Sequence, residues 1–316
     1  MLAKIWENHH RSSTFLNKIK QIILHFKDKI KQTLSNTKLF KIFQNDKLLL
    51  LFIIQNNIIT VDESIALMHL NGDNKIERNY RHFFFPEIQY KLNEQMKQEI
   101  EQEMKNIHPD IFVNFEEKRQ KGENDSYLCE LIRTDSIEDF ISYVNQKNIS
   151  LSSKIKSSIF ETNSFLVEKE PSLIEYTAFF GSIQIFQYLL NKKTKINVSL
   201  WVYSIHSDNA EIIGLLEENE NQLSKESFNL ILKESIKCHH NNIAHYIIDN
   251  YIDPEFITNL KYNYGEHING YSIQYYNFEF FPTKFSDCYI IFYLVEFDYL
   301  KSVKICLSSK KMYKKA

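Results

Sequence analysis

Residues 172–190 read Ser172-Leu-Ile-Glu-Tyr-Thr-Ala-Phe-Phe-Gly-Ser-Ile-Gln-Ile-Phe-Gln-Tyr-Leu-Leu190. Apolar residues with helical spacing lie on both sides of the glycine, so the segment predicts two helices joined by a tight turn at Gly181. Glycine suits this turn because it adopts a positive φ without steric cost. The small residues Thr177 and Ala178 would allow the first helix to lie close to a neighbouring helix. A single helix pair leaves an apolar face uncovered, so we expect several such pairs to stack.

The same pattern returns twice further along the chain. Segments 173–189, 200–216 and 231–247 align without gaps. Aligned positions share apolar or small residues: Leu173, Leu200 and Ile231; Thr177, Ser204 and Ser235; Ile185, Ile212 and Ile243; Phe186, Ile213 and Ala244; Leu189, Leu216 and Ile247. Degraded copies extend the pattern over residues 135–144, 298–307 and 48–66. The repeat predicts an all-α fold, a solenoid of helical hairpins with degenerate helical repeats toward the N-terminus.

The first copy resembles the ankyrin repeat. Thr177 and Ala178 match its paired alanines, and Gly181 matches its turn glycine. Four phrases are similar to those of a large protist ankyrin family, which in trichomonad parasites carries a domain of unknown function. They are Asn114-Phe-Glu-Glu-Lys-Arg119, Gly122-Glu-Asn-Asp-Ser-Tyr127, Glu170-Pro-Ser-Leu-Ile-Glu-Tyr176 and Ile236-Lys-Cys-His-His-Asn-Asn242. The similarity covers nearly the whole chain from His9 onwards. The resemblance implies an interaction scaffold and brings no catalytic residues with it.

The pattern along the chain predicts six segments. They are an N-terminal helical region (1–107), a connecting segment (108–125), ankyrin-like repeats (126–250), a loop or damaged repeat (251–283), a C-terminal helical pair (284–309) and a basic tail (310–316). Within the first segment we expect an amphipathic helix over 15–34. Pro86 is expected to open a polar helix over 87–106, because proline suits the first turn of a helix.

Charge and composition exclude several classes of partner and location. The formal net charge is -2, and the basic stretches at 18–41 and 310–315 lack a recognised nucleic-acid module, so no nucleic-acid partner is expected. The four cysteines lie far apart and indicate reduced thiols. No signal-peptide pattern is present, and the longest apolar run, 48–54, is too short to cross a bilayer. We therefore expect a cytoplasmic protein, and these features argue against membrane association.

One cluster could carry chemistry, namely Cys238, His239 and His240 with His245 following. A structural zinc site needs four ligands, and the sequence shows no paired Cys or His motif beside this cluster, so no metal is expected. Adjacent residues on a helix point in different directions, which argues against a Cys–His nucleophile pair. Phosphate-binding glycine motifs are absent from the sequence. We expect no catalytic residue, no cofactor and no small-molecule substrate.

The function predicted from these patterns is non-catalytic binding of a protein partner through the concave face of the repeats. The residues expected on that face are Lys192, Lys193, Lys195, Tyr203 and His206. Two alternatives stay open. One is a structural or membrane-surface protein that uses the basic N-terminal helices, and the other is an enzyme or zinc site around Cys238.

Overall fold

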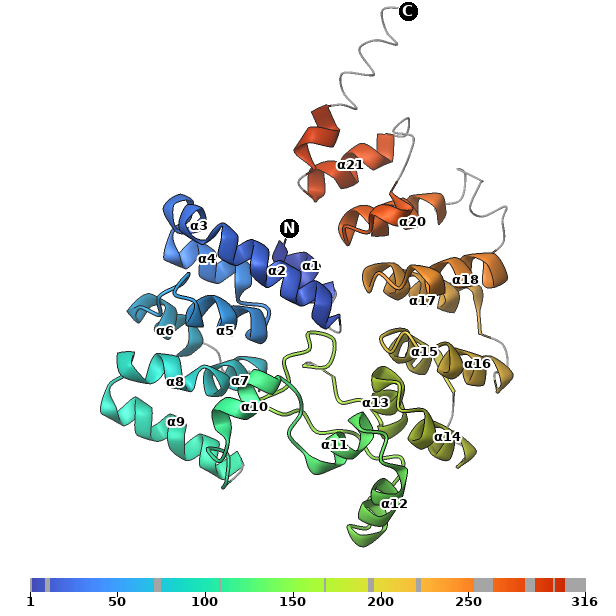
Figure 1. Cartoon of the computed structure of the whole chain (residues 1–316), viewed down its shortest axis with the longest axis horizontal. Helices are drawn as coiled ribbons and strands as arrows, with labels where there is room; N and C mark the ends of the chain where they lie inside the picture. Colours follow the sequence, from blue (N-terminus) through green and yellow to red (C-terminus); the bar gives the residue numbers. More distant parts are fainter. Residues whose placement is uncertain are drawn as a thin grey trace, which may run out of the picture. The chain divides into compact units, whose positions relative to one another are not determined.

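A computed structural model describes residues 2–8, 12–70, 75–107, 109–167, 169–192, 196–219, 223–252, 264–281, 288–297 and 299–304 (Figure 1). Regular structure in these residues is helical throughout, and the one strand-type pairing among them is an isolated bridge between Lys154 and Ser172. The predicted all-α fold class is confirmed at this level. Contacts divide the chain into an N-terminal unit, Met1–Tyr176, and a C-terminal unit, Thr177–Ala316.

The first part of the N-terminal unit is a series of short helices. They are α1 (Leu2–Asn8), α2 (Ser13–His25), α3 (Lys27–Thr33), α4 (Asn36–Phe43), α5 (Lys47–Gln55), α6 (Glu63–Leu70), α7 (Lys75–Phe83), α8 (Phe85–Ile88), the 3₁₀ helix η1 (Gln89–Lys91) and α9 (Glu94–Ile107). Helix α5 holds the apolar run and lies in the core, with Leu49, Leu50 and Ile53 fully buried. The Asp46 carboxylate starts this helix by accepting a hydrogen bond from the Leu49 N–H at 2.7 Å.

Two predicted helices are interrupted. The amphipathic stretch 15–34 forms α2 and α3, because the backbone leaves helical geometry at Phe26 (φ -97°, ψ 10°). Pro86 lies in the first turn of a helix, as expected, but α8 ends at Ile88. The chain is extended at Leu92 (φ -97°, ψ 153°), and the polar helix α9 starts afresh at Glu94. Amphipathic spacing continues across both breaks, which explains why spacing alone did not reveal them.

The remainder of the N-terminal unit departs from the predicted segments. The expected connection at 108–125 contains α10 (Phe115–Lys121), which ends at Gly122 in left-handed geometry (φ 67°). Helices α11 (Tyr127–Arg133) and α12 (Ile137–Gln146) form the next hairpin. The described residues between α12 and α13 then run without a helix, although this stretch was predicted to belong to the repeats. Phe160 and Leu166 are buried there, so the irregular stretch contributes to the core.

The C-terminal unit consists of helical hairpins in chain order. Its helices are α13 (Leu173–Phe180, which begins in the N-terminal unit), α14 (Ile183–Asn191), α15 (Val198–Ile205), α16 (Ala210–Glu218), α17 (Lys225–Lys237), α18 (Asn241–Tyr251), α20 (Tyr264–Gln274), the 3₁₀ helix η2 (Phe278–Phe280) and α21 (Cys288–Glu296). Helix α17 packs against its hairpin partner α18 and against both α15 and α20 (Figure 1). Successive first helices of the hairpins therefore lie side by side.

The same turn joins the two helices of each hairpin. One residue in the turn has left-handed geometry: Asp135 (φ 49°), Gly181 (φ 76°), Asp208 (φ 52°), His239 (φ 57°) and Tyr276 (φ 57°). The next N–H commonly bonds the carbonyl five residues earlier, as from Ser182 to Thr177 at 3.1 Å and from His240 to Ser235 at 3.0 Å. The sequence alignment placed Gly181, Asp208 and His239 at one position, and their shared geometry confirms it.

Small residues of the repeat are fully buried where first helices meet. The hydroxyls of Ser204 and Ser235 each donate to the carbonyl four residues earlier, at 2.8 and 2.9 Å, so they need no partner from a neighbouring helix. Ser272 in α20 is equally buried and precedes the Tyr276 turn by the same four residues. The described part of the segment predicted as a loop or damaged repeat, residues 264–281, is therefore a hairpin in which the short η2 stands in place of the second helix, in agreement with the damaged-repeat alternative.

The C-terminal end follows the predicted helical pattern in part. Helix α21 covers Cys288–Glu296, and residues 300–304 are again helical. The basic tail at 310–316 lies outside the described residues.

Candidate functional site

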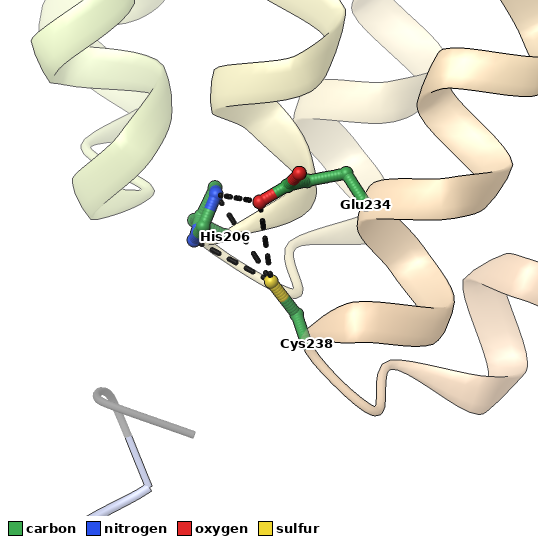
Figure 2. A group of neighbouring side chains, drawn as sticks. All are labelled: His206, Glu234 and Cys238. Atoms are coloured by element: carbon green, nitrogen blue, oxygen red, sulfur yellow. Dashed lines mark hydrogen bonds and ion pairs between the residues drawn. The ribbon is translucent and has the colours of Figure 1, made fainter. Parts of the chain in front are cut away.

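A cluster of three potential metal ligands lies between two adjacent hairpins of the C-terminal unit. His206 directly follows the last residue of α15, while Glu234 lies in the last turn of α17 and Cys238 directly follows that helix. The four-residue spacing of Glu234 and Cys238 places both on one side of α17 (Figure 2). We call these three residues the buried trio. Among the described residues, this is the one place where three or more such side chains converge.

The trio is tightly spaced and shielded from solvent. His206 Nε2 lies 3.0 Å from Glu234 Oε1. The Cys238 sulfur lies 3.9 Å from the same carboxylate oxygen. Relative exposure is 3% for His206 and 5% for Cys238, and 13% for the side chain of Glu234. Lys237 Nζ reaches Glu234 Oε1 at 2.8 Å from the partly exposed side of the cluster.

Burial and hydrogen bonding set the protonation states of the trio. Burial lowers the pKa of His206 to about 4, outweighing the hydrogen bond to Glu234 that favours the charged form. The pKa of Glu234 lies below its ordinary range, because the hydrogen bond from His206 and the charge of Lys237 outweigh the effect of burial. Burial and the nearby Glu234 raise the pKa of the Cys238 thiol. At neutral pH the cluster therefore holds a neutral imidazole, a carboxylate and a thiol.

The sulfur of Cys238 lies over the face of the imidazole ring. It is 3.6 Å from Nδ1 and 4.0 Å from Nε2 (Figure 2). A thiol that donated to the Nδ1 lone pair in the ring plane would be much farther from Nε2 than from Nδ1. A Cys–His nucleophile pair requires that the ring accept the thiol proton along a nitrogen lone pair. In this arrangement the sulfur does not lie in that direction. The geometry therefore does not favour a Cys–His nucleophile pair at Cys238.

Aromatic and polar neighbours hold the trio in place. The ring of Phe179 lies against the imidazole of His206, with centroids 4.9 Å apart and planes inclined by 30°. Next to the cluster, His240 Nδ1 lies 3.4 Å from the Asp208 carboxylate. Because Phe179 covers the imidazole, the orientation of the ring is set by packing as well as by Glu234.

The residues predicted for a binding face lie in different environments. Lys192 is exposed and its ammonium group lies 5.4 Å from the centroid of the Tyr188 ring, whereas Lys193 and Lys195 lie outside the described residues. Tyr203 and His206 are only 5% and 3% exposed. The expectation that these two side chains face a partner is wrong, because both point into the contacts between hairpins.

The predicted Cys–His cluster also separates in space. His239 adopts the left-handed turn geometry and its Nε2 lies 2.9 Å from the Tyr275 carbonyl oxygen. His245 is exposed and lies 3.5 Å from a Glu279 carboxylate oxygen. Cys238 instead meets Glu234 and His206, which sequence reasoning did not group with it. The sequence does contain one sign that Glu234 is unusual, because the aligned residues in the other two copies are both tyrosines, Tyr176 and Tyr203.

A second candidate lies within the N-terminal unit, where a cavity of about 720 Å³ is bounded by α7, α9 and the segments around residues 125 and 158. Its carboxylates are engaged, since Glu103 pairs with Arg81 at 2.9 Å and Asp125 pairs with Lys118 at 3.3 Å. Burial lowers the pKa of His82, which lines the cavity and lies 3.2 Å from Glu103. The cavity offers polar groups but no trio of metal ligands among the described residues.

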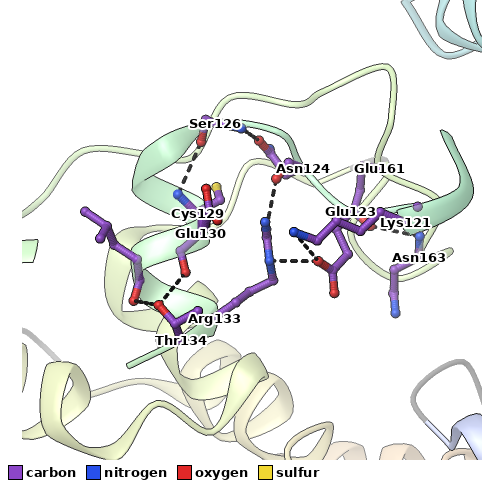
Figure 3. A network of polar contacts seen from close by, with 12 residues as sticks. Lys121, Glu123, Asn124, Ser126, Cys129, Glu130, Arg133, Thr134, Glu161 and Asn163 are labelled. Atoms are coloured by element: carbon purple, nitrogen blue, oxygen red, sulfur yellow. Dashed lines mark hydrogen bonds and ion pairs between the residues drawn. The ribbon is translucent and has the colours of Figure 1, made fainter. Parts of the chain in front are cut away.

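A network of polar contacts centred on Arg133 stabilises one edge of this cavity (Figure 3). Arg133 donates to the Asn124 carbonyl at 2.9 Å and lies 3.0 Å from the Glu123 carboxylate. The Ser126 hydroxyl accepts from the Cys129 N–H at 3.3 Å and so starts α11. These contacts fix Asn124 and Ser126, both of which line the cavity. The network therefore has a structural role in the described arrangement.

Comparison of the chain with protein-family models, with curated proteins and with solved structures gave no match. Within the described part of the chain, none of the helices has the length and apolar character needed to cross a membrane.

Proposed function

We propose that the chain is a non-catalytic scaffold whose hairpins form an ankyrin-type array and bind a protein partner. The observation that carries the proposal is the recurring hairpin, with one left-handed turn residue and one fully buried small residue in successive copies. Arrays of this kind present a row of equivalent surface positions, and such rows are suited to binding an extended protein surface.

The proposed binding surface lies on the first helices of the hairpins. Ser199 and Val202 of α15 are three residues apart and share a face, and Leu230 and Lys233 occupy the aligned positions on α17. Leu230 is 55% exposed, which is unusual for a leucine within a packed array. Lys233 Nζ lies 5.4 Å from the centroid of the Tyr271 ring of α20 and extends the surface to the next helix. We call these five residues the first-helix surface.

This surface replaces the one predicted from sequence. An exposed leucine beside a lysine and a tyrosine combines an apolar anchor with polar groups around it, as binding hot spots in protein interfaces do. The surface involves no buried residue, so substitutions there leave the core unchanged. It can therefore be tested without unfolding the hairpins.

The test is affinity capture with chemical crosslinking, using the wild-type chain, a Leu230→Glu/Lys233→Glu variant and a Tyr90→Glu control. Tyr90 is 82% exposed and belongs to the N-terminal unit, so it matches the apolar-to-acidic change at a site off the surface. We expect a protein that crosslinks to the wild type and to Tyr90→Glu but not to the double variant. Equal capture by all three proteins would refute the surface, and the absence of any specific protein would refute the scaffold function.

A further inference from the structure

The buried trio occupies repeat positions that are aromatic in the first copy of the repeat. Glu234 aligns with Tyr176, His206 aligns with Phe179, and Cys238 aligns with Phe180. Burying polar groups in place of aromatic ones costs free energy unless the groups find strong partners. Two successive copies of the hairpin, the second with His206 and the third with Glu234 and Cys238, therefore carry ligand atoms that meet one another at these positions.

The spacing of these ligand atoms fits a small cation. Glu234 Oε1, His206 Nε2 and Cys238 Sγ are separated by 3.0, 3.9 and 4.0 Å. Three atoms with these separations share one point that is about 2.1 Å from each of them. Zinc binds carboxylate oxygen and imidazole nitrogen at about 2.0–2.2 Å and thiolate sulfur at about 2.3 Å. An ion at that point would have three bonds close to the lengths that zinc requires.

We propose that His206, Glu234 and Cys238 bind a zinc ion, which goes beyond the scaffold function and does not depend on it. The donor set selects the metal, since thiolate and imidazole favour zinc and related transition ions over magnesium or calcium. Three protein ligands leave a fourth position for water or for a group from a partner. Glu234 and Cys238 come from the end of α17 and His206 from the end of α15, so the ion would connect two successive hairpins.

Binding rearranges three groups of the cluster. Cys238 releases its proton to become a thiolate, and the imidazole carries its proton on Nδ1 so that Nε2 is free to bind. The imidazole ring must also turn about its Cβ–Cγ bond and shift against Phe179, because in the metal-free arrangement the sulfur lies over the face of the ring. Lys237 leaves Glu234 Oε1, which its partly exposed side chain permits (24% exposed). Lys237 therefore competes with the ion for the carboxylate.

The experiment uses the full chain after treatment with a chelator, titrated with Co²⁺ and then with Zn²⁺ in competition. Cobalt bound by a thiolate gives a charge-transfer absorption in the near ultraviolet, which reports Cys238 as a ligand. Cys129→Ser is the matched control, because Cys129 is also a fully buried free thiol but belongs to the N-terminal unit. We expect one cobalt ion per chain in the wild type and in Cys129→Ser, displaced by zinc, and loss of the absorption in Cys238→Ser.

A second variant distinguishes a lost ligand from a lost fold. Lys237→Met removes the competing ammonium group without touching a ligand, so zinc should bind about tenfold more tightly than in the wild type. Glu234→Gln should weaken zinc binding by about 100-fold or more, since even changes beyond the ligands cost about 10- to 100-fold. The proposal is overturned if the wild type gives no thiolate band, if Cys238→Ser retains the band, or if Lys237→Met binds zinc no more tightly.

Discussion

Replacement of Arg119 by methionine should destabilise the N-terminal unit by about 3 kcal/mol. Arg119 is 1% exposed in α10 and forms a two-pronged ion pair with Glu87, with both N–O distances at 2.7 Å. It also donates to the Phe83 carbonyl at 2.8 Å and lies 2.9 Å from Glu116. Its guanidinium group lies 5.4 Å from the centroid of the Phe83 ring. One side chain thus ties α10 to α7 and α8.

The expected loss of unfolding free energy depends on the Glu87 carboxylate, which Arg119→Met leaves without its partner. Removing one partner of a buried ion pair costs about 3–5 kcal/mol, because the other charge stays buried without compensation. The Glu87 side chain is 16% exposed and regains some hydration, which moves the expected loss to the lower end of that range. Methionine preserves much of the side-chain volume, so little of the loss should come from a cavity. Arg119→Lys keeps the charge but not the two-pronged geometry and should cost about 1–2 kcal/mol.

The two tryptophans provide an assay for each unit separately. Trp6 lies in the N-terminal unit and Trp201 in the C-terminal unit, at 1% and 0% exposure. In a Trp201→Phe background the fluorescence of Trp6 reports urea unfolding of the N-terminal unit alone. Arg78→Met serves as the control, because Arg78 is exposed and should change stability by less than about 0.5 kcal/mol. A loss below about 1 kcal/mol for Arg119→Met would refute the reasoning, as would equal losses for the two variants.

Four further predictions concern the turn, the Arg133 network and, in two cases, the dependence of stability on pH. Gly181→Ala should destabilise the C-terminal unit by about 1–2 kcal/mol in urea unfolding, because a side chain is strained at φ 76°. Tyr176→Phe removes the hydroxyl 3.0 Å from Arg133 and should cost about 1 kcal/mol in the N-terminal unit by the same assay. Burial raises the pKa of Asp46 to about 7, so the folded state retains a proton that the unfolded state loses between about pH 4 and 7. The free energy of unfolding should fall as pH rises through that window. In Asp46→Asn the urea midpoint should depend less on pH over the same range. Burial lowers the pKa of Lys47 to about 7, so stability should rise between about pH 7 and 10.5, and Lys47→Met should abolish that rise.

The hairpins of the C-terminal unit could be predicted because their determinants are local. Helical spacing, a small residue and a turn position lie within about one repeat of each other, and a gapless alignment brings them into register. The turn position was recognised through Gly181, although Asp208 and His239 also adopt positive φ there without being glycine. Tyr276 shows the limit of this approach. Its hairpin lacks a full second helix, so the apolar spacing that would have marked it is missing.

Contacts between distant residues could not be predicted from the same patterns. Lys47 is fully buried and donates to the carbonyls of Ile159 and Glu161 at 2.9 and 3.0 Å, more than 100 residues away along the chain. A lysine at the start of an apolar helix ordinarily indicates a solvated helix end. Only the packing of the irregular stretch around residue 160 against α5 makes this lysine internal. The sequence carries no periodic signal for such a stretch.

The burial of Tyr203 and His206 also results from contacts with residues outside their own helix. The apolar spacing of residues 200–205 identifies α15, but it does not show which side of the helix the neighbouring hairpin covers. Phe179 lies against His206, with ring centroids 4.9 Å apart, and the end of α17 completes the enclosure of His206. Sequence periodicity therefore placed Tyr203 on the correct helix and His206 at its end, but assigned both residues to the wrong side.

Helix α17 links the two proposals physically. Its exposed side carries Leu230 and Lys233 of the first-helix surface, and its C-terminal end carries Glu234 and Cys238 of the buried trio. A zinc ion held between these ligands and His206 would fix the end of α17 against the end of α15, which are the two helices that present the surface. Docking of a partner would then cost less conformational entropy, because the metal already restricts the relative motion of α15 and α17. The buried Glu234 and Cys238 would in this way help to position Leu230 and Lys233, which the same helix presents to a partner.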